Sequence, residues 1–475
     1  IEPSTVDRSK LPELGPQKSS KFPKHQRARL SNRLEVVLAQ RAGVSTVIMN
    51  LVSVAGYKTD HLSSPGTAEL TMNLLDEGTK DKTSLQINEQ LQLLGASLST
   101  FSDQDQSNVY MSTLKPSFDA SLNLFADVIL NPEFPQEEFN RLKNEQINDI
   151  KQEKSEPFGM ALRVMNKYLY GEDHPYGSPY TGTGYEETVS KLTRDDVAKF
   201  YNTWIKPNNS TLIVTGDISM DELKPKLEKA MGKWKKGEVP QIVFKAPKTY
   251  TKNTLYLMNR PESQQSVIIA GHLTNKYGAV SEVALEQMVN ILGGDFNSRI
   301  NMNLREDKHW SYGAGGFVLG SKEERPFIMY APVQTDKTAE SVTELRKEIS
   351  DFISSRPPTQ EELDRVKSNQ VLKLPGQWET NSSLNSSVRS MLRYGLPDDY
   401  YETYDQNVRN LSLEDIKGVS RDVVKPEEVN WFMVGDRAKI ISKLDDLGFD
   451  EIVEIDADGK PIVPALEQQD TDIKN

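Results

Sequence analysis

Short runs of apolar and β-branched residues recur along the chain between longer polar stretches. The runs at 34–39 and 46–54 are each followed by a glycine within a few residues. Such runs predict buried strands. The runs at 210–215 and 429–434 have the same character, and a Gly-Asp pair follows each of them. We expect each of these two later runs to close one structural unit.

The polar stretches between these runs predict helices and turns. Residues 136–156 contain neither Pro nor Gly and carry a charged face, which predicts one long helix ended by Pro157. Residues 96–114 predict two strands on either side of the polar segment 103–106. The chain therefore combines strands with long helices.

The chain repeats itself at an offset of about 220 residues. Residues 136–143 have the sequence QEEFNRLK, and residues 360–367 have the sequence QEELDRVK, an offset of 224. Four further matches follow in the same order, which indicates that one structural unit has been duplicated. They are 176–179 with 394–397, 192–197 with 411–416, 206–207 with 425–426, and 216–217 with 435–436.

The duplication predicts an α+β fold of two tandem homologous domains. Each domain should contain a mixed, mainly antiparallel sheet with helices packed on one face. We place the domains at 29–234 and 253–461, with a linker at 235–252 that is rich in Lys, Pro and Gly. Residues 1–28 and 462–475 are expected to be terminal arms.

Composition and charge exclude several classes of protein. The 475 residues include 57 basic and 69 acidic ones, and the net charge of -12 argues against nucleic acid because phosphate binding needs clustered Lys and Arg. No apolar run approaches the roughly 18 residues of a membrane span. The absence of cysteine excludes disulfides, thiolate metal sites and a Cys nucleophile. We expect neither nucleic acid nor a membrane span.

The sequence starts at Ile1, without a Met. Removal of a signal peptide would explain this start, and so would trimming of the chain for another reason. We expect a periplasmic or otherwise exported protein, and a cytoplasmic one is the alternative.

The segment after the second predicted strand keeps a motif frame but not its chemistry. Residues 66–73 are Gly-Thr-Ala-Glu-Leu-Thr-Met-Asn, and Gly-Thr follows at 78–79. This frame resembles that of the pitrilysin and mitochondrial processing peptidase family, in which G-x-A-H-x-x-E-H carries two zinc histidines and a general base. The resemblance covers nearly the whole chain, including the stretches 174–177 and 192–217.

The resemblance implies that the family's zinc histidines correspond to Glu69 and Asn73, its general base to Met72, and its third zinc ligand to Asp149. An Asn amide is a poor zinc ligand, and a thioether cannot take a proton from water. No two histidines have i, i+4 spacing. We therefore expect no metal or other cofactor in this chain, and no activity alone. We interpret Glu69 and Asp149 as ordinary polar residues of a helix face, with a structural Ca²⁺ as the alternative.

A second motif lies in the second half of the chain. Residues 298–306 are Ser-Arg-Ile-Asn-Met-Asn-Leu-Arg-Glu, and Tyr312 follows. The family has an Arg and a Tyr seven residues apart in such a frame, so the resemblance implies a role for Arg305 and Tyr312 in binding substrate. A guanidinium can hold a peptide carbonyl, and a phenol can donate to a developing oxyanion. The structural alternative is that Arg305 pairs with an acid and Tyr312 packs in the sheet.

The features around this motif favour structural roles. We expect His309 on the surface and Trp310 packed. Gly293-Gly294 and the glycine-rich residues 313–316 lack the spacing of phosphate loops, so they predict turns and close packing. The run at 96–114, where the family pairs an edge strand with extended substrate, predicts plain sheet structure in this subunit.

Together these motifs predict the zinc-free subunit of a heterodimeric pitrilysin-type metallopeptidase. A homologous chain with HxxEH would hold zinc and the general base, and this chain would supply Arg305 and Tyr312 to peptide hydrolysis in that site. The heterodimers could pair further. One alternative is a structural or assembly subunit, like the core proteins of a respiratory complex that share this fold. Another is a peptide-binding module that acts without a partner.

Overall fold

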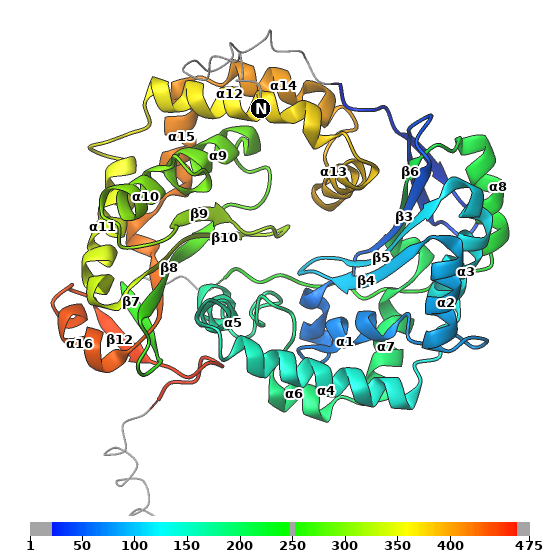
Figure 1. The fold of residues 1–475 in the computed structure, drawn as a ribbon, viewed down its shortest axis with the longest axis horizontal. Helices are drawn as coiled ribbons and strands as arrows, with labels where there is room; N and C mark the ends of the chain where they lie inside the picture. The colour runs from blue at the N-terminus through cyan, green and yellow to red at the C-terminus, as the bar shows by residue number, and fades with distance from the viewer. Residues whose placement is uncertain (1–20, 248–251, 463–475) are drawn as a thin grey trace, which may run out of the picture.

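The computed structural model describes residues 21–247 and 252–462, which form two six-stranded sheets (Figure 1). The strand orders are β1-β2-β6-β3-β5-β4 and β12-β7-β11-β8-β10-β9. In the first sheet only β2 and β6 are parallel, and in the second β7 is parallel to both β11 and β12. The predicted α+β class, with two homologous units built on mixed, mainly antiparallel sheets, is confirmed.

The strands lie where the apolar runs predict them. The first sheet contains β1 (Gln26–Arg29), β2 (Glu35–Gln40), β3 (Thr46–Ser53), β4 (Ser97–Ser102), β5 (Ser107–Leu114) and β6 (Ser210–Gly216). The second contains β7 (Thr254–Asn259), β8 (Gln265–Thr274), β9 (Gly315–Val318), β10 (Arg325–Gln334), β11 (Asn430–Gly435) and β12 (Glu451–Glu454). The runs at 34–39, 46–54, 210–215 and 429–434 thus correspond to β2, β3, β6 and β11.

Helices connect and cover the strands in both halves. The first half contains α1 (Thr67–Leu74), α2 (Ser84–Leu94), α3 (Phe118–Leu130), α4 (Gln136–Glu153), α5 (Pro157–Tyr170), α6 (Glu186–Lys191), α7 (Arg194–Trp204) and α8 (Met220–Met231). The second contains α9 (Glu282–Val289), α10 (Arg299–Asn301), α11 (Thr338–Phe352), α12 (Gln360–Gln377), α13 (Asn381–Tyr394), α14 (Tyr400–Asn410), α15 (Leu413–Val423) and α16 (Arg437–Asp445). Three short turns of helix matter below: η1 (Tyr57–Leu62), η4 (Asn290–Gly294) and η5 (Met302–Asp307).

Equivalent elements confirm the duplication. Strands β2 and β7 start 219 residues apart (254 − 35), as do β3 and β8 (265 − 46). Helices α4 and α12 start at the first residues of the two matching segments, 136–143 and 360–367, and each helix has 18 residues. The outermost strand breaks the symmetry, because β1 precedes its sheet and runs antiparallel to β2 whereas β12 follows its sheet and runs parallel to β7.

The prediction of one helix over 136–156 was wrong at its end. Helix α4 stops at Glu153, and a turn over 154–156 leads directly into α5. Pro157 is the first residue of α5, where its missing N–H leaves no hydrogen bond unmade. The proline therefore marks a helix start instead of a helix end.

Each sheet is covered on one face by helices of its own half and on the other by a helix of the opposite half (Figure 1). Helix α5 of the first half packs on β8 and β11, and α13 of the second half packs on β3 and β6. Met160 and Val164 of α5 join Ile269 and Phe432 of the second sheet in one core. The helices of each half cover one face of their own sheet, as predicted, and the helix from the opposite half on the other face is an addition to that prediction. This exchange of helices makes each half part of the other's core.

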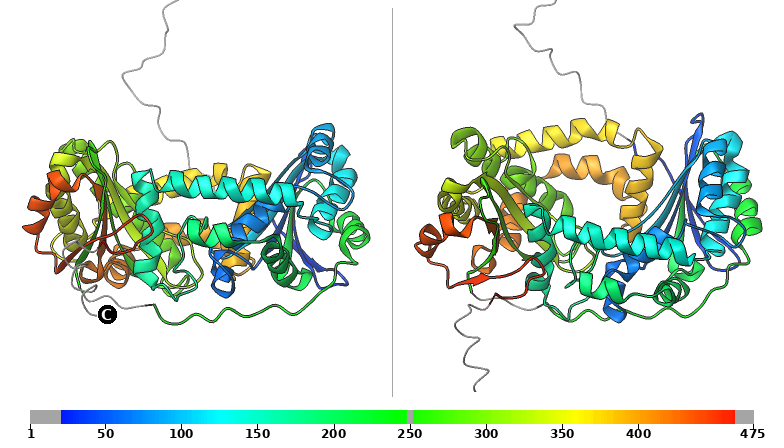
Figure 2. Two further views of the ribbon diagram at one scale, coloured as in Figure 1. Left: turned by 90° about the horizontal axis from the view of Figure 1, so that it is seen from below. Right: turned by 60° about the horizontal axis from the view of Figure 1, so that its bottom comes forward.

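The segment between the halves runs along the outside of the molecule (Figure 2). Its described residues, 235–247, contain neither helix nor strand. Most of the expected N-terminal arm and nearly all of the C-terminal tail lie outside the described residues. Residues 26–28, expected in the arm, belong instead to β1, and Phe22 is buried against the rings of Trp378 and Tyr401.

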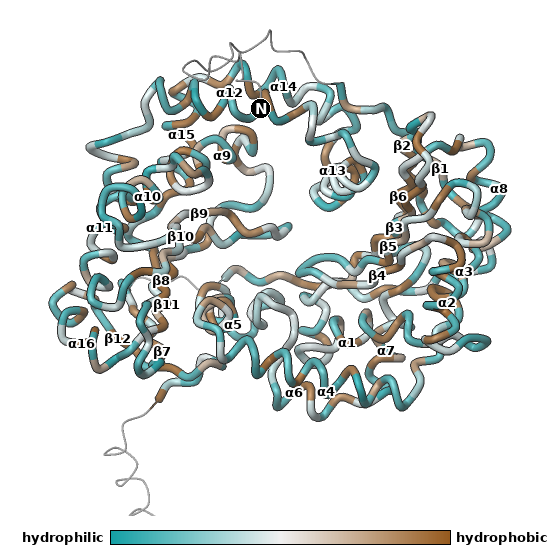
Figure 3. The backbone as a smooth tube through the Cα atoms, viewed as in Figure 1, coloured by the Kyte–Doolittle hydropathy of each residue, from teal (hydrophilic) through white to brown (hydrophobic). Residues whose placement is uncertain are grey.

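Apolar residues are concentrated in the strands of both sheets, whereas the outer helices α4 and α12 are mainly polar (Figure 3). This distribution is expected for sheets buried on both faces. Within the described part of the chain, no helix has the length and apolar character needed to cross a membrane.

Candidate functional site

Helix α1 carries three of the four degenerate zinc-site positions, and its N-terminus is fixed by backbone geometry. Gly66 has a φ of 97°, and a Cβ there would lie 2.7 Å from the Thr183 carbonyl oxygen. The buried Asp60 carboxylate accepts hydrogen bonds from the N–H groups of Gly66 (2.8 Å) and Ala68 (3.0 Å). These donors would otherwise lack partners at the start of the helix. The glycine of the motif frame is therefore required by the fold.

Glu69 and Asn73 lie one turn apart on α1 and are hydrogen-bonded to each other. The Asn73 side-chain N–H donates to one Glu69 oxygen (3.3 Å), and the Tyr57 hydroxyl donates to the other (3.1 Å). Burial raises the pKa of Glu69, the two hydrogen bonds partly oppose this shift, and the charge of Asp149 adds to it. These side chains form a partly buried polar cluster.

The other two degenerate positions have different surroundings. Met72 is 1% exposed and belongs to the hydrophobic core of the first half. Asp149 lies on the exposed side of α4, and partial burial of its carboxyl together with the charges of Glu145 and Glu153 raises its pKa. Because α1 and α4 are in contact, Asp149 is close enough to Glu69 to affect the pKa of that carboxyl.

This set of side chains does not fit a hydrolytic zinc site, which needs imidazole or carboxylate ligands and a base beside them. Both oxygens of Glu69 already accept hydrogen bonds, Asn73 directs its N–H to Glu69, and Met72 faces the core. Among residues 21–247 and 252–462, no group of three or more His, Asp or Glu side chains could hold a metal ion. The five histidines of the chain are His25, His61, His174, His272 and His309.

Sequence reasoning did not identify Tyr57, which holds the polar cluster in place. Its hydroxyl also lies 2.6 Å from the Ser102 carbonyl, and burial followed by the negative charge of Glu69 raises its pKa. Its ring packs on Gly182, where a Cβ would lie 2.0 Å from a ring atom. The Gly-Thr-Gly sequence at 182–184 was the only signal that something approaches the backbone there.

The β4–β5 turn connects the two halves near this cluster. Asp105 is buried and accepts hydrogen bonds from the Lys58 ammonium (3.0 Å), the Tyr176 hydroxyl (2.6 Å) and the backbone N–H of Lys322 (3.0 Å). Lys322 belongs to the β9–β10 turn, and the two hairpins point toward each other from opposite halves (Figure 1). The stretch 174–177, which resembles the family pattern, thus has a structural role in joining the halves.

Arg305 lies in η5 and is partly exposed. Its guanidinium carbon is 4.6 Å from the centroid of the Phe296 ring, which is itself 57% exposed. Its Nε lies 3.4 Å from the Glu306 carboxylate, and about two fifths of each side chain is exposed. An ion pair as exposed as this contributes little free energy. Arg305 is therefore held loosely enough to bind another group.

Tyr312 is 89% exposed and forms no hydrogen bond with any described residue. It follows a tight turn in which His309 has a φ of 58° and places its Nδ1 3.0 Å from the Arg305 carbonyl oxygen. The Trp310 N–H donates to the Leu304 carbonyl (3.0 Å), which closes the turn. Tyr312 is thus presented at the surface and is not packed in the sheet.

The glycines of the second half pack closely against one another. A Cβ on Gly293 would lie 2.3 Å from the Gly316 nitrogen, and a Cβ on Gly315 would lie 2.6 Å from the Gly293 oxygen. A Cβ on Gly313 would have no heavy atom within 4 Å. The predicted close packing is confirmed for Gly293, Gly315 and Gly316.

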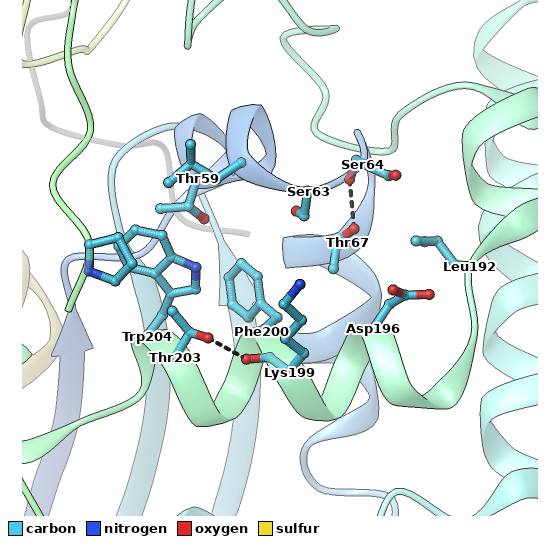
Figure 4. A pocket seen from close by; sticks show the side chains of 12 residues that line it. Thr59, Ser63, Ser64, Thr67, Leu192, Asp196, Lys199, Phe200, Thr203 and Trp204 are labelled. Atoms are coloured by element: carbon cyan, nitrogen blue, oxygen red, sulfur yellow. Dashed lines mark hydrogen bonds between the residues drawn. The ribbon is translucent and has the colours of Figure 1, made fainter. Parts of the chain in front are cut away.

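Two cavities have none of the predicted site residues of the two halves in their linings. One of about 380 Å³ lies between α7 and the segment from η1 to the start of α1, where Lys199 points toward Ser63 and Thr67 (Figure 4). The other, of about 680 Å³, is mainly apolar and lies along β9. Neither is lined by a degenerate zinc-site residue or by the Arg and Tyr of the second half. Tyr312 and the partly exposed Arg305 therefore lie at the surface of the chain, outside both cavities.

Two family models match the chain. Residues 35–174 match the model described as "Insulinase (Peptidase family M16)". Residues 191–370 match the model described as "Peptidase M16 inactive domain". The first match contains the degenerate zinc-site positions, and the second contains Arg305 and Tyr312.

Relatives of the chain include both peptidases and a non-peptidase. A Helicobacter pylori protein named zinc protease PqqE is 23% identical over 423 residues, which cover 86% of this chain and 91% of that protein. A second Helicobacter pylori protein, named non-peptidase homolog YmxG, is 21% identical over 376 residues, covering 79% of this chain and 85% of that protein. The chain is thus similar to both kinds of protein from one organism.

Solved structures share the fold. The structure of a peptidase M16 inactive domain from Pseudomonas fluorescens superposes with a TM-score of 0.80 at 21% identity, covering 86% of this chain and 97% of that chain. The periplasmic protease PqqL from Escherichia coli superposes with a TM-score of 0.71 at 15% identity, covering 91% of this chain but 51% of that chain. The second match aligns this chain with about half of a longer protein.

Proposed function

Given that the chain belongs to peptidase family M16, the insulinase family, we propose that it is a zinc-free subunit that joins a homologous HxxEH-bearing chain and supplies Arg305 and Tyr312 to peptide hydrolysis. The observation that carries this proposal is the contrast between the two halves. Among the zinc-site positions of the first half, Glu69 and Asn73 are hydrogen-bonded to each other and Met72 is buried, which leaves Asp149 alone on an exposed helix face. Tyr312 is 89% exposed and has no hydrogen-bond partner among the described residues. An exposed loop residue whose hydroxyl has no protein partner is available to bind a ligand.

In this proposal the partner's zinc supplies the Lewis acid and the activated water. Arg305 binds a carbonyl or carboxylate of the peptide through its forked N–H groups. Tyr312 donates its O–H to the oxygen that becomes negative when water attacks the scissile amide. Both groups act across the interface, because this chain has neither a base at Met72 nor a ligand pair at Glu69 and Asn73.

Two further comparisons support this proposal. Helicobacter pylori has both a relative named zinc protease and one named non-peptidase homolog, as expected if the two kinds of chain work together. The similar PqqL protein is periplasmic, in keeping with our proposal that this chain is exported. Pairing of heterodimers into larger assemblies is an extension of the same proposal.

The test is reconstitution. The purified chain is mixed with an HxxEH-bearing M16 protein from the same organism and zinc, and hydrolysis of a quenched fluorescent peptide is followed. We expect cleavage only in the mixture. Arg305→Ala and Tyr312→Phe should each lower kcat by about 10²-fold, the scale of one lost transition-state donor, while the complex still forms on gel filtration.

Arg194→Ala is the matched control, because Arg194 is an exposed arginine of α7 in the other half. It should leave turnover unchanged. Unchanged rates in Arg305→Ala and Tyr312→Phe, with an intact complex, would rule out the donor role and favour a structural or assembly subunit. Tight peptide binding by the isolated chain, without turnover in any mixture, would favour the peptide-binding module.

A further inference from the structure

Arg305 and Tyr312 lie on two separate segments, so their relative position depends on contacts that hold these segments together. Arg305 belongs to η5, whereas Tyr312 lies in the loop that leads into β9. The last backbone pairing before Tyr312 is the isolated bridge between Ser311 and Val333. Beyond it, Gly313 has no heavy atom near the position of a Cβ. Across Tyr312, the Ser311 hydroxyl accepts from the Gly313 N–H (3.1 Å) and donates to the Gly313 carbonyl (2.9 Å). These bonds are local to the turn, so its place on the protein depends on anchors at its two ends.

The second anchor is the side chain of Asn301. Asn301 is the last residue of α10, four residues before Arg305, and it is 5% exposed. Its side-chain N–H donates to the Phe296 carbonyl (2.7 Å), and its side-chain oxygen accepts from the Ala314 N–H (3.2 Å). One amide thus connects the segment before the Arg-bearing helix to the segment directly after Tyr312.

The two hydrogen bonds of Asn301 reach both parts of the candidate site. The Phe296 backbone that it holds carries the ring against which Arg305 packs (4.6 Å). The Ala314 N–H that it binds lies two residues after Tyr312. A buried side chain that satisfies backbone groups on two segments limits their relative motion, because moving either one would leave a polar group unpaired.

We propose that Asn301 is a positioning residue that holds Tyr312 at a fixed place relative to Arg305. This inference rests on the proposed function, in which both groups must meet one peptide in the partner's site. Loss of about 1 Å of precision between two such groups is enough to slow a reaction strongly. Asn301 itself touches neither substrate nor metal in this proposal.

The test uses Asn301→Leu, which keeps the volume but loses both hydrogen bonds, and Asn301→Asp, which keeps an acceptor for Ala314. Asn32→Leu is the matched control. Asn32, in a turn of the first half, is also buried, and its side chain donates to the Met231 carbonyl (2.8 Å) and accepts from the Leu34 N–H (3.1 Å). Both Leu variants should lose similar stability. A difference between them in hydrogen exchange or in kcat therefore reflects the position of the Tyr312 segment and not a general loss of stability.

Two measurements are made on each variant. The first is amide hydrogen exchange at 310–316 in the isolated chain, which we expect to accelerate at least about tenfold in Asn301→Leu, less in Asn301→Asp, and not in Asn32→Leu. The second is cleavage by the reconstituted complex at saturating partner. There we expect kcat to fall about tenfold or more in Asn301→Leu with little change in KM, and to recover partly in Asn301→Asp.

Unchanged exchange at 310–316 in Asn301→Leu would overturn the inference, whatever the turnover. So would wild-type kcat in that variant when Tyr312→Phe lowers kcat. If exchange accelerates but neither Arg305→Ala nor Tyr312→Phe affects cleavage, then Asn301 positions the loop and the proposed donor role is what fails.

Discussion

Lys58 and Asp105 form an ion pair 3.0 Å long in which each side chain is less than a tenth exposed. Asp105 also accepts the N–H of Lys322 from the second half, so the pair lies where the two halves meet. Removing one member of a buried pair leaves the other charge without compensation. The contribution of this ion pair to the contact between the halves can therefore be measured as a change in the free energy of unfolding.

We expect Asp105→Asn to lower the free energy of unfolding by about 3 to 5 kcal/mol, because the Lys58 ammonium would stay buried without its partner. Urea denaturation followed by circular dichroism measures this loss. Asp217→Asn is the control, since the Lys115–Asp217 pair has the same length but is 46% and 26% exposed. It should cost much less stability, because an exposed ion pair is screened by solvent. Equal losses in the two variants would show that the buried pair has no special part in holding the halves together.

Met72 gives a second prediction, because its burial explains why a general base is incompatible with the present core. Met72→Glu should lower the free energy of unfolding by about 3 kcal/mol or more, since a carboxyl at a site 1% exposed must lose its water. Met72→Leu, which keeps the apolar character, should cost less than about 1.5 kcal/mol. Chemical denaturation of both variants provides the comparison. A Met72→Glu protein as stable as Met72→Leu would mean that position 72 opens to solvent.

The motif frame at 66–73 and the duplication could be predicted because both depend on local sequence. The polar cluster around Glu69 could not, because Tyr57 reaches it from a 3₁₀ turn that no motif marks. The sequence also did not predict that α5 packs on the second sheet and α13 on the first. An amphipathic helix shows which of its faces is buried, but its sequence does not say which sheet covers that face. Asn301 was missed for the same reason, since its two partners are set by tertiary contact.

The glycines of the second half give a third prediction, which separates close packing from a loop that binds a ligand. Gly293→Ala should destabilise the chain by about 1 to 3 kcal/mol, because its Cβ would lie 2.3 Å from the Gly316 nitrogen and neither backbone can move freely. Gly313→Ala should change stability by no more than about 0.5 kcal/mol, since nothing lies within 4 Å of its Cβ. Thermal and urea unfolding of both variants tests this. The reverse order of the two losses would contradict the packing described here.

Asp76 gives a fourth prediction, on pH. It follows α1, accepts a hydrogen bond from Thr100 (3.4 Å), and burial raises its pKa from 3.8 to about 6. Between these two values the unfolded chain has lost the proton that the folded chain keeps. Stability from this group is therefore fully present below about pH 4, falls as the pH rises toward 6, and stays lower above that.

Asp76→Asn removes this titration while keeping the shape of the side chain. Relative to wild type, the variant should therefore gain stability between pH 4 and pH 7, by at most about 3 kcal/mol for a shift of this size. The control Asp217→Asn should differ from wild type by a nearly constant amount over this range, because the hydrogen bond from Lys115 lowers the pKa of Asp217 and the stability that this gives the wild type is lost only as the pH falls below about 4. Denaturation midpoints measured from pH 4 to pH 7 distinguish the two. A constant difference between Asp76→Asn and wild type across that range would mean that Asp76 ionises in the folded chain as it does in water.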